Sequence, residues 1–310
     1  MSKKPNILEM ARAPFLFAIV VPLAISTLLS VHITGRLNLL GLTFASLLGI
    51  SLHVTTNVYN DIYDTKQGAD TSRSAENEFS GGSGILVNHP DMEKSMLTLA
   101  RTGIVLGTIG YFGLLLISES KFWPTLTFIF LVSVFLSKYY TAGPFQFAYR
   151  GLGEIVVWFG FGPLAVLLGA IGQNVGFHPY IISIMPITGL STLFIVWMGQ
   201  MVDLPDDKAA GKRGLVARMG LEKSVYGLLF IHILALINVI FVSFLLNPGR
   251  FLLVALIPHG FLLPLLFKKL SQEEKDKTLM REISKLNFIL YVLFSVSLMI
   301  GFLFQLMAEI

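Results

Sequence analysis

Long apolar stretches, separated by short polar ones, recur along the whole chain. Each has about the 20 residues that a helix needs to cross the hydrocarbon core of a bilayer, and none shows the strict alternation that is typical of a strand. The pattern predicts nine membrane-spanning helices, at residues 14–32, 38–59, 96–117, 122–137, 152–172, 180–202, 224–246, 250–267 and 287–307. The predicted fold class is therefore all-α, a polytopic membrane protein.

The composition agrees with a protein that lies almost entirely in a membrane. Of its 310 residues, 54% are hydrophobic and only 14% are charged, and the mean hydropathy is +0.72. In soluble proteins, about a quarter of all residues are charged. Nine helices leave no room for a separate soluble domain, so we expect a single domain over residues 1–310. Because the chain has no cysteine, disulfides, zinc-thiolate sites and cysteine nucleophiles are excluded.

The basic residues are unevenly distributed between the two sides of the membrane. If the connections alternate between sides, all but three of the 23 Lys and Arg residues lie on the side of the N-terminus, the exceptions being Arg36, Lys121 and Arg250. Basic residues gather on the cytoplasmic side, so the bias supports an odd helix count and a cytoplasmic N-terminus. It also explains the pI of about 9.2 without a nucleic-acid partner. We expect an integral protein of a bacterial inner membrane, without a cleaved signal peptide.

Two acidic clusters follow predicted helices on this cytoplasmic side. They are Asn60-Asp61-Ile62-Tyr63-Asp64, which runs on to Asp70, and Asp203-Leu204-Pro205-Asp206-Asp207. Carboxylates are costly near hydrocarbon, so a membrane protein that keeps them there usually needs them for function. If each helix continues through its cluster, the i, i+4 pairs Asn60/Asp64 and Asp203/Asp207 each stack on one helix face.

These oxygen pairs predict a metal site. Mg²⁺ prefers oxygen ligands and is usually held by a few carboxylates together with waters and substrate phosphates, so two facing pairs suit ions that bridge a diphosphate. The predicted metal ligands are Asn60, Asp64, Asp70, Asp203 and Asp207. The alternative is that both clusters are ordinary solvated loops. Their matched spacing on one side of the membrane favours the site. Their separation of 143 positions (207 minus 64) hints at related halves, 14–150 and 151–307.

Around these clusters the chain resembles the UbiA-type intramembrane prenyltransferases, which have an Asn/Asp-rich motif after the second helix and a DxxxD motif after the sixth. It is most similar to the 1,4-dihydroxy-2-naphthoate polyprenyltransferases of menaquinone synthesis. That similarity rests on the stretches NVYNDIYDTKQGADT, SKYYTAGPFQFAYRGLGEIVVWFGFGP and DLPDDKAAGKRGLVARMG. The resemblance extends from the first helix to the ninth. One difference is that residues 199–202 lack the Asn and Arg often seen before the second motif.

The resemblance implies nine helices around a central cleft with an active site at its cytoplasmic end. It implies Mg²⁺-dependent transfer of a prenyl group from an isoprenyl diphosphate to an aromatic acceptor, with 1,4-dihydroxy-2-naphthoate giving demethylmenaquinone. Other acceptors known in the superfamily are 4-hydroxybenzoate, homogentisate, chlorophyllide and a glycerol phosphate. The candidate catalytic residues are Asn60, Asp61, Asp64, Asp203, Asp207 and Tyr140. No feature of the sequence sets an oligomeric state.

The proposed chemistry needs positive charge beside the leaving diphosphate and aromatic faces beside the allylic cation. The candidate diphosphate-binding residues are Arg73, Lys138, Arg150 and Lys212, and the candidate aromatic residues are Tyr139, Tyr140, Phe145, Phe147, Tyr149 and Trp158. Each also suits a role as a membrane-interface anchor. The glycine-rich run at 80–84 predicts a lid with backbone N–H groups for phosphate, unless that connection is a disordered loop.

Two other classes of protein also place acids on membrane helices. In an ion-coupled secondary transporter, we would expect the acidic residues near the bilayer midplane, with broken helices in matching halves. Here the acidic residues lie at helix ends. A CDP-alcohol phosphotransferase uses paired Asp motifs, but neither cluster contains the D-G-x-x-A-R element of that family.

Overall fold

The computed structural model describes residues 4–71, 77, 79, 81–246, 249–273 and 275–308. Within these residues, nine helical segments are long and apolar enough to cross a bilayer, which confirms the predicted count. The spans are Ala13–Thr34 (including α2, Phe17–Thr34), Leu39–Lys66 (α3), Pro90–Ile117 (including α5, Glu93–Ile117), Ser120–Tyr139 (including α6, Trp123–Tyr139), Gly153–Gly172 (α7, Gly153–Phe159, and α8, Ala165–Gly172), Pro179–Ala209 (α9), Leu215–Leu245 (α10), Arg250–Leu270 (including α11, Leu256–Leu270) and Lys277–Met307 (α12).

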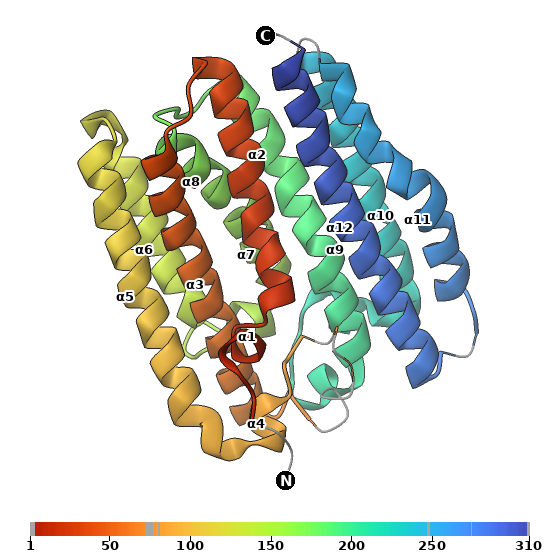
Figure 1. Cartoon of the computed structure of the whole chain (residues 1–310). Helices are drawn as coiled ribbons and strands as arrows, with labels where there is room; N and C mark the ends of the chain where they lie inside the picture. Colours follow the sequence, from red (N-terminus) through yellow and green to blue (C-terminus); the bar gives the residue numbers. More distant parts are fainter. Residues whose placement is uncertain are drawn as a thin grey trace.

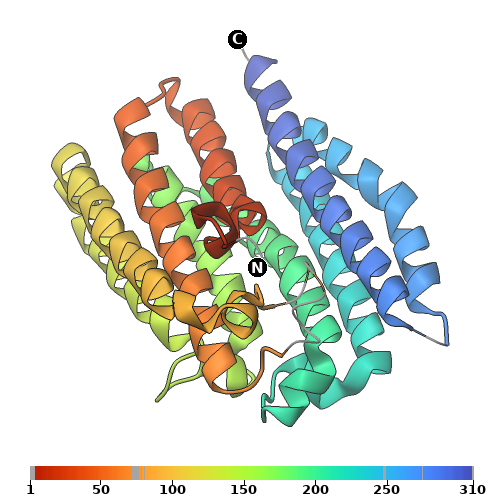
Figure 2. The same ribbon diagram turned by 60° about the horizontal axis from the view of Figure 1, so that its bottom comes forward.

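The spanning helices run side by side in one bundle (Figure 1). Helix α9 lies in its middle, and 78% of the most apolar part of α9 is buried, compared with 17% for α6 at the edge. The chain starts at one end of the bundle and finishes at the other, as an odd helix count requires (Figure 1). The short helices α1 (Ile7–Met10) and α4 (Ile85–Asn88) lie at the starting end, which we call the motif end (Figures 1 and 2).

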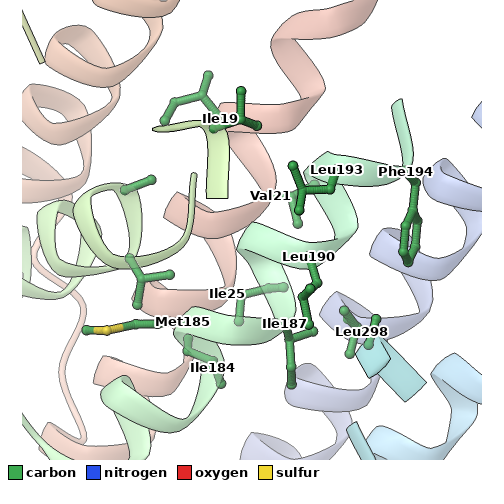
Figure 3. Packing of buried hydrophobic residues seen from close by; sticks show 14 of the residues in the cluster. Ile19, Val21, Ile25, Ile184, Met185, Ile187, Leu190, Leu193, Phe194 and Leu298 are labelled. Atoms are coloured by element: carbon green, nitrogen blue, oxygen red, sulfur yellow. The ribbon is translucent and has the colours of Figure 1, made fainter. Parts of the chain in front are cut away.

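The central core joins α9 to its neighbours. Ile187 and Leu190 of α9 lie beside Ile25 of α2 and Leu298 of α12 (Figure 3). In a bilayer the surroundings are as apolar as the core, so helices associate through close packing and polar contacts more than through burial of apolar surface. Large apolar side chains on the outside, such as Leu116 with 87% exposure, are therefore expected.

A glycine stripe on α5 sets the position of α3. Its members are Gly103, Gly107, Gly110 and Gly113, spaced three or four residues apart, and each faces α3. A Cβ atom added at Gly110 would lie 2.7 Å from the backbone nitrogen of Leu48 and 2.8 Å from the carbonyl oxygen of Phe44. Small residues thus allow the two backbones to approach closely.

Several helices differ from the predicted spans. Helices α10 and α12 begin at Leu215 and Lys277, before the predicted starts at residues 224 and 287. Helices α3 and α9 continue past residues 59 and 202 to Lys66 and Ala209, so both acidic clusters lie on helix rather than in loops. The predicted helix 152–172 contains a π-turn at Gly160–Leu164, which accommodates Pro163, a residue without a backbone N–H.

We expect Gly110→Ala to lower the free energy of unfolding by about 1–3 kcal/mol, because its methyl group would press on the α3 backbone. The matched control is Gly260→Ala on α11, where no atom lies within 4 Å of an added Cβ. Thermal unfolding in detergent compares the two variants, and equal midpoints would contradict the packing assigned to the glycine stripe.

Candidate active site

A cavity of about 170 Å³ opens between α3 and α9 at the motif end. Both acidic clusters contribute to it, through Asn60 and Asp64 of α3 and through Asp203 and Asp207 of α9. Its other polar lining residues are Arg12, His53, Thr56, Asn57, Tyr140, Thr192, Gln200 and Lys212. The structure therefore brings together two motifs that are more than a hundred residues apart in the sequence.

The first motif forms a hydrogen-bonded oxygen cluster. The Asn60 Nδ2 donates to Asp64 Oδ2 over 3.1 Å, so this i, i+4 pair does stack on one face of α3. The Tyr149 hydroxyl donates to Asp64 Oδ1 (2.8 Å), and the Thr141 hydroxyl donates to Asn60 Oδ1 (2.7 Å). Asp64 and Asn60 are thus oriented from the loop that follows α6.

Lys212 joins the two motifs. Its Nζ lies 2.9 Å from Asp64 Oδ2 and 3.0 Å from Asp207 Oδ1, and the three side chains are 14%, 3% and 10% exposed. Burial opposes the charge on the ammonium group, but the two carboxylates outweigh it and hold the pKa of Lys212 well above its ordinary value. A permanent cation therefore bridges the ends of α3 and α9.

The glycine-rich segment lies across both motifs. The backbone N–H of Gly81 donates to the Asp203 carboxylate, and that of Ser83 donates to Asp61 Oδ1 over 2.9 Å. The Arg12 guanidinium donates to the Gly81 carbonyl. A Cβ atom at position 81 would lie 2.8 Å from Asp203 Oδ2, so glycine allows this approach without a shift of the Asp203 side chain. Ser80 lies outside the described residues, and a lid movement stays a prediction.

The site has more buried carboxylate than its own cations satisfy. Asp61 and Asp70 are 1% and 9% exposed, and among the described residues each has one side-chain oxygen without a hydrogen-bond partner. Burial, together with repulsion from Asp64 and Asp61, raises the pKa of Asp70 to about 9. Asp70 is therefore protonated at neutral pH unless a further cation stabilises its charge.

The donor set suits a hard cation such as Mg²⁺, because it consists of carboxylate and amide oxygens. In the described part of the chain, no three or more His, Cys, Asp or Glu side chains are arranged to hold a metal by themselves. A metal ion here would need oxygen atoms from both helices and from substrate or water, as is usual for Mg²⁺.

Comparison with known proteins identifies the fold family. Residues 19–290 match the UbiA prenyltransferase family. The chain belongs to the UbiA prenyltransferase family. A 2-carboxy-1,4-naphthoquinone phytyltransferase of Synechocystis is 25% identical over 67% of this chain and 64% of its own length. A 1,4-dihydroxy-2-naphthoate octaprenyltransferase of Bacillus subtilis is 28% identical over 70% of this chain and 67% of its own length.

A solved structure has the same fold. The UbiA homolog from Archaeoglobus fulgidus, bound to GPP and Mg²⁺, superposes with a TM-score of 0.61 over 94% of this chain and 98% of that protein, at 12% identity. At this identity the likeness shows the fold alone. It agrees with an all-helical bundle around a central cleft, as the sequence predicts for this UbiA family member.

The remaining predicted residues divide into those inside and outside the cavity. Tyr140 lines it, and burial and the charge of Glu154 raise the pKa of this phenol, which is therefore neutral. Lys138 instead lies with its Nζ 5.4 Å from the ring centroid of Tyr139, and the Arg150 side chain donates to the Pro144 carbonyl. Neither basic residue lines the cavity. Arg73 lies outside the described residues.

The residues of the predicted aromatic cluster lie in different places in the structure. Tyr139, Phe145 and Phe147 pack around Phe135, and Trp158 lines a different groove. Tyr149 is the member that reaches an acidic motif, through its hydrogen bond to Asp64.

Sequence reasoning missed Arg12 as a site residue. It lies 48 positions before Asn60 (60 minus 12) and reads as one of many positive-inside residues. Its place in the cavity depends on the chain turning at Arg12, which has φ 54°, just before α2 enters the bundle. Thr141 and Gln200 were missed for a similar reason, because neither belongs to an acidic motif.

We expect Lys212→Met to lower the free energy of unfolding by about 3 kcal/mol in EDTA, because it leaves two buried carboxylates without their counterion. Mg²⁺ should restore more stability to this variant than to the unaltered protein, since a cation that binds only the folded state stabilises it. Thermal unfolding with and without Mg²⁺ tests this, with the exposed Lys208→Met as control. No gain from Mg²⁺ would argue against a metal site at these carboxylates.

Proposed function

We propose that this protein is an Mg²⁺-dependent prenyltransferase of a bacterial inner membrane, with its motif end in the cytoplasm. It transfers a prenyl group from an isoprenyl diphosphate to 1,4-dihydroxy-2-naphthoate. One observation carries the proposal: Asp64 of α3 and Asp207 of α9 both contact the Lys212 ammonium, at the polar end of a cavity that adjoins an apolar one. The names of the similar Synechocystis and Bacillus proteins support a naphthoate acceptor.

The polar end would bind the diphosphate. Asn60, Asp64, Asp70, Asp203 and Asp207 would hold Mg²⁺, which when bound neutralises the charge that develops on the departing diphosphate. Lys212 and Arg12 line the same cavity, and their cations would contact the phosphate oxygens directly. Tyr149 keeps Asp64 in place through its hydroxyl.

The middle of the cavity would hold the reacting carbon. His53, Tyr140 and Phe161 line both the polar and the apolar cavities, so they surround the junction between them. Their ring faces can stabilise an allylic cation, and the apolar surroundings keep out water that would otherwise capture it. Tyr140 has a neutral phenol, so it would contribute its ring face and not a negative charge.

The apolar cavity, of about 110 Å³, would receive the prenyl tail. Its apolar lining includes Leu48, Leu52, Ile129, Leu136, Leu164 and Leu168. Helix α3 lines both ends of this path, from Asp64 at the polar end to Gly49 at the apolar end. That separation of 15 residues (64 minus 49) corresponds to about 22 Å along a helix, long enough for an isoprenoid chain of several units.

Mass spectrometry of the product tests the proposal. Purified protein would receive a mixture of prenyl diphosphates, Mg²⁺ and aromatic acceptors that includes 1,4-dihydroxy-2-naphthoate, 4-hydroxybenzoate and homogentisate. A prenylated naphthoquinol product is expected. If another acceptor is prenylated instead, the protein is still a prenyltransferase, but the proposed acceptor is wrong. No transfer to any acceptor would favour the ion-coupled transporter, although the acids lie at helix ends rather than in the middle of a span.

We expect Asp207→Asn to reduce kcat/KM by about 100-fold or more, because it removes charge from the group that would hold the metal. The matched control is Asp206→Asn, the neighbouring acid of the same motif, which does not line the cavity and should stay within about twofold. The steady-state rate of diphosphate release gives kcat/KM for both variants. Equal losses in the two variants would contradict the assignment of the Asp203/Asp207 face.

Gly160→Phe is expected to shorten the prenyl chains that the enzyme accepts. No described atom lies within 4 Å of a Cβ added at Gly160, and the residue lines the apolar cavity, so we expect a ring there to occupy part of the cavity. Turnover of the longest diphosphates should fall about tenfold or more while the shortest retain activity. A competition assay with a mixture of prenyl diphosphates of different chain lengths measures this preference, with Gly160→Ala as the control. An unchanged preference would place the tail elsewhere.

A further inference from the structure

A second polar pocket, of about 610 Å³, lies behind the wall of the candidate site. We call it the arginine pocket, after Arg150, Arg213 and Arg218, and its other polar lining residues are Gln67, Gln146 and Tyr149. Tyr149 connects this pocket to the inner site, because its hydroxyl donates to Asp64 and its ring centroid lies 5.1 Å from the Lys212 Nζ.

Two of the three guanidinium groups of this pocket, those of Arg218 and Arg150, donate to neutral acceptors. Arg218 donates from Nε to the Arg213 carbonyl (2.7 Å) and from Nη2 to the Arg150 carbonyl (3.0 Å), and Arg150 donates to the Pro144 carbonyl (2.7 Å). No carboxylate within 4.0 Å pairs with any of the three in the described part of the chain. The three guanidinium groups therefore give the arginine pocket a positive electrostatic potential.

A glycine allows this arrangement. Gly151 has φ +80°, and a Cβ atom there would lie 2.5 Å from Arg218 Nη2 and 2.9 Å from the Arg213 carbonyl oxygen. Only glycine lets the guanidinium lie against the backbone at this point. The pocket is thus a formed feature of the loops after α6 and α9.

The shape and chemistry of the pocket fit a soluble anion with several oxygens. Among the residues that line it, the structure places amides, guanidiniums and one phenol, and no long aliphatic side chain that could pack against an acyl chain. Guanidinium groups bind phosphate oxygens in pairs, through parallel N–H donors. A diphosphate ion matches this better than a lipid headgroup with its attached chains.

We propose that the arginine pocket binds free inorganic diphosphate, as a second anion site on the outer side of Tyr149. The choice of diphosphate rests on the proposed function, in which this ion is the leaving group. Lys212 and Arg213 are consecutive, with Lys212 lining the inner cavity and Arg213 the outer pocket. An anion released from the inner site therefore meets a second set of cations one residue further along the loop.

Calorimetric titration with inorganic diphosphate in EDTA tests this, because without metal the acidic inner site repels the ion. Binding is expected in phosphatidylcholine nanodiscs, with about tenfold or greater weakening in the double variant Arg150→Gln/Arg213→Gln. Lys212→Met should retain it, since that residue lies in the inner site. Thermal unfolding in EDTA first checks that the unaltered protein and every variant are folded at the titration temperature. Arg150→Lys/Arg213→Lys should recover part of the affinity.

Three results would overturn the proposal: no metal-free binding, binding that the double glutamine variant leaves unchanged, or binding that is lost in Lys212→Met. A repeat in nanodiscs with phosphatidylglycerol separates the sources of phosphate, because displacement of diphosphate by this lipid would show a headgroup site instead. The titration requires no turnover, so its outcome is independent of the prenyl-transfer assay.

Discussion

The bridge from Lys212 to Asp64 and Asp207 is the interaction on which the candidate site depends. Two buried carboxylates at adjoining helix ends repel each other, and their burial is costly without a counterion. The ammonium group at 2.9 and 3.0 Å satisfies this need and holds the ends of α3 and α9 at one cavity. In the described part of the chain, one oxygen each of Asp61 and Asp70 has no hydrogen-bond partner, so this one cation does not compensate the whole cluster.

The bundle keeps these charges in place by packing that does not depend on the hydrophobic effect. The glycine stripe of α5 fixes α3 through close backbone contact, and α9 is enclosed by α2, α10 and α12. Because both helices continue through their acidic clusters, the bundle itself positions the site residues, with loops adding Tyr149, Lys212 and the glycine-rich segment. Helices α3 and α9 thus supply the carboxylate and amide oxygens, and the loops supply the Lys212 ammonium and the backbone N–H donors.

The sequence predicted those features that depend on local periodicity. The nine spans follow from the lengths of apolar stretches, and the stacking of Asn60 on Asp64 follows from the helical repeat. Basic residues were harder to assign, because the positive-inside bias places many of them at the same end. Of the predicted diphosphate-binding residues in the described chain, Lys212 lines the cavity, whereas Lys138 and Arg150 do not. Only tertiary packing distinguishes them, and the same holds for Arg12.

The most direct test of this account is to observe a divalent cation between the two motifs and the substrate. Pulsed electron paramagnetic resonance with Mn²⁺ and a non-reactive prenyl thiodiphosphate would report phosphorus atoms bonded to the metal through oxygen. We expect a ³¹P hyperfine coupling that is lost in both Asp64→Asn and Asp207→Asn and retained in Asp206→Asn. A coupling that persists when either motif is neutralised would contradict a shared site at the ends of α3 and α9.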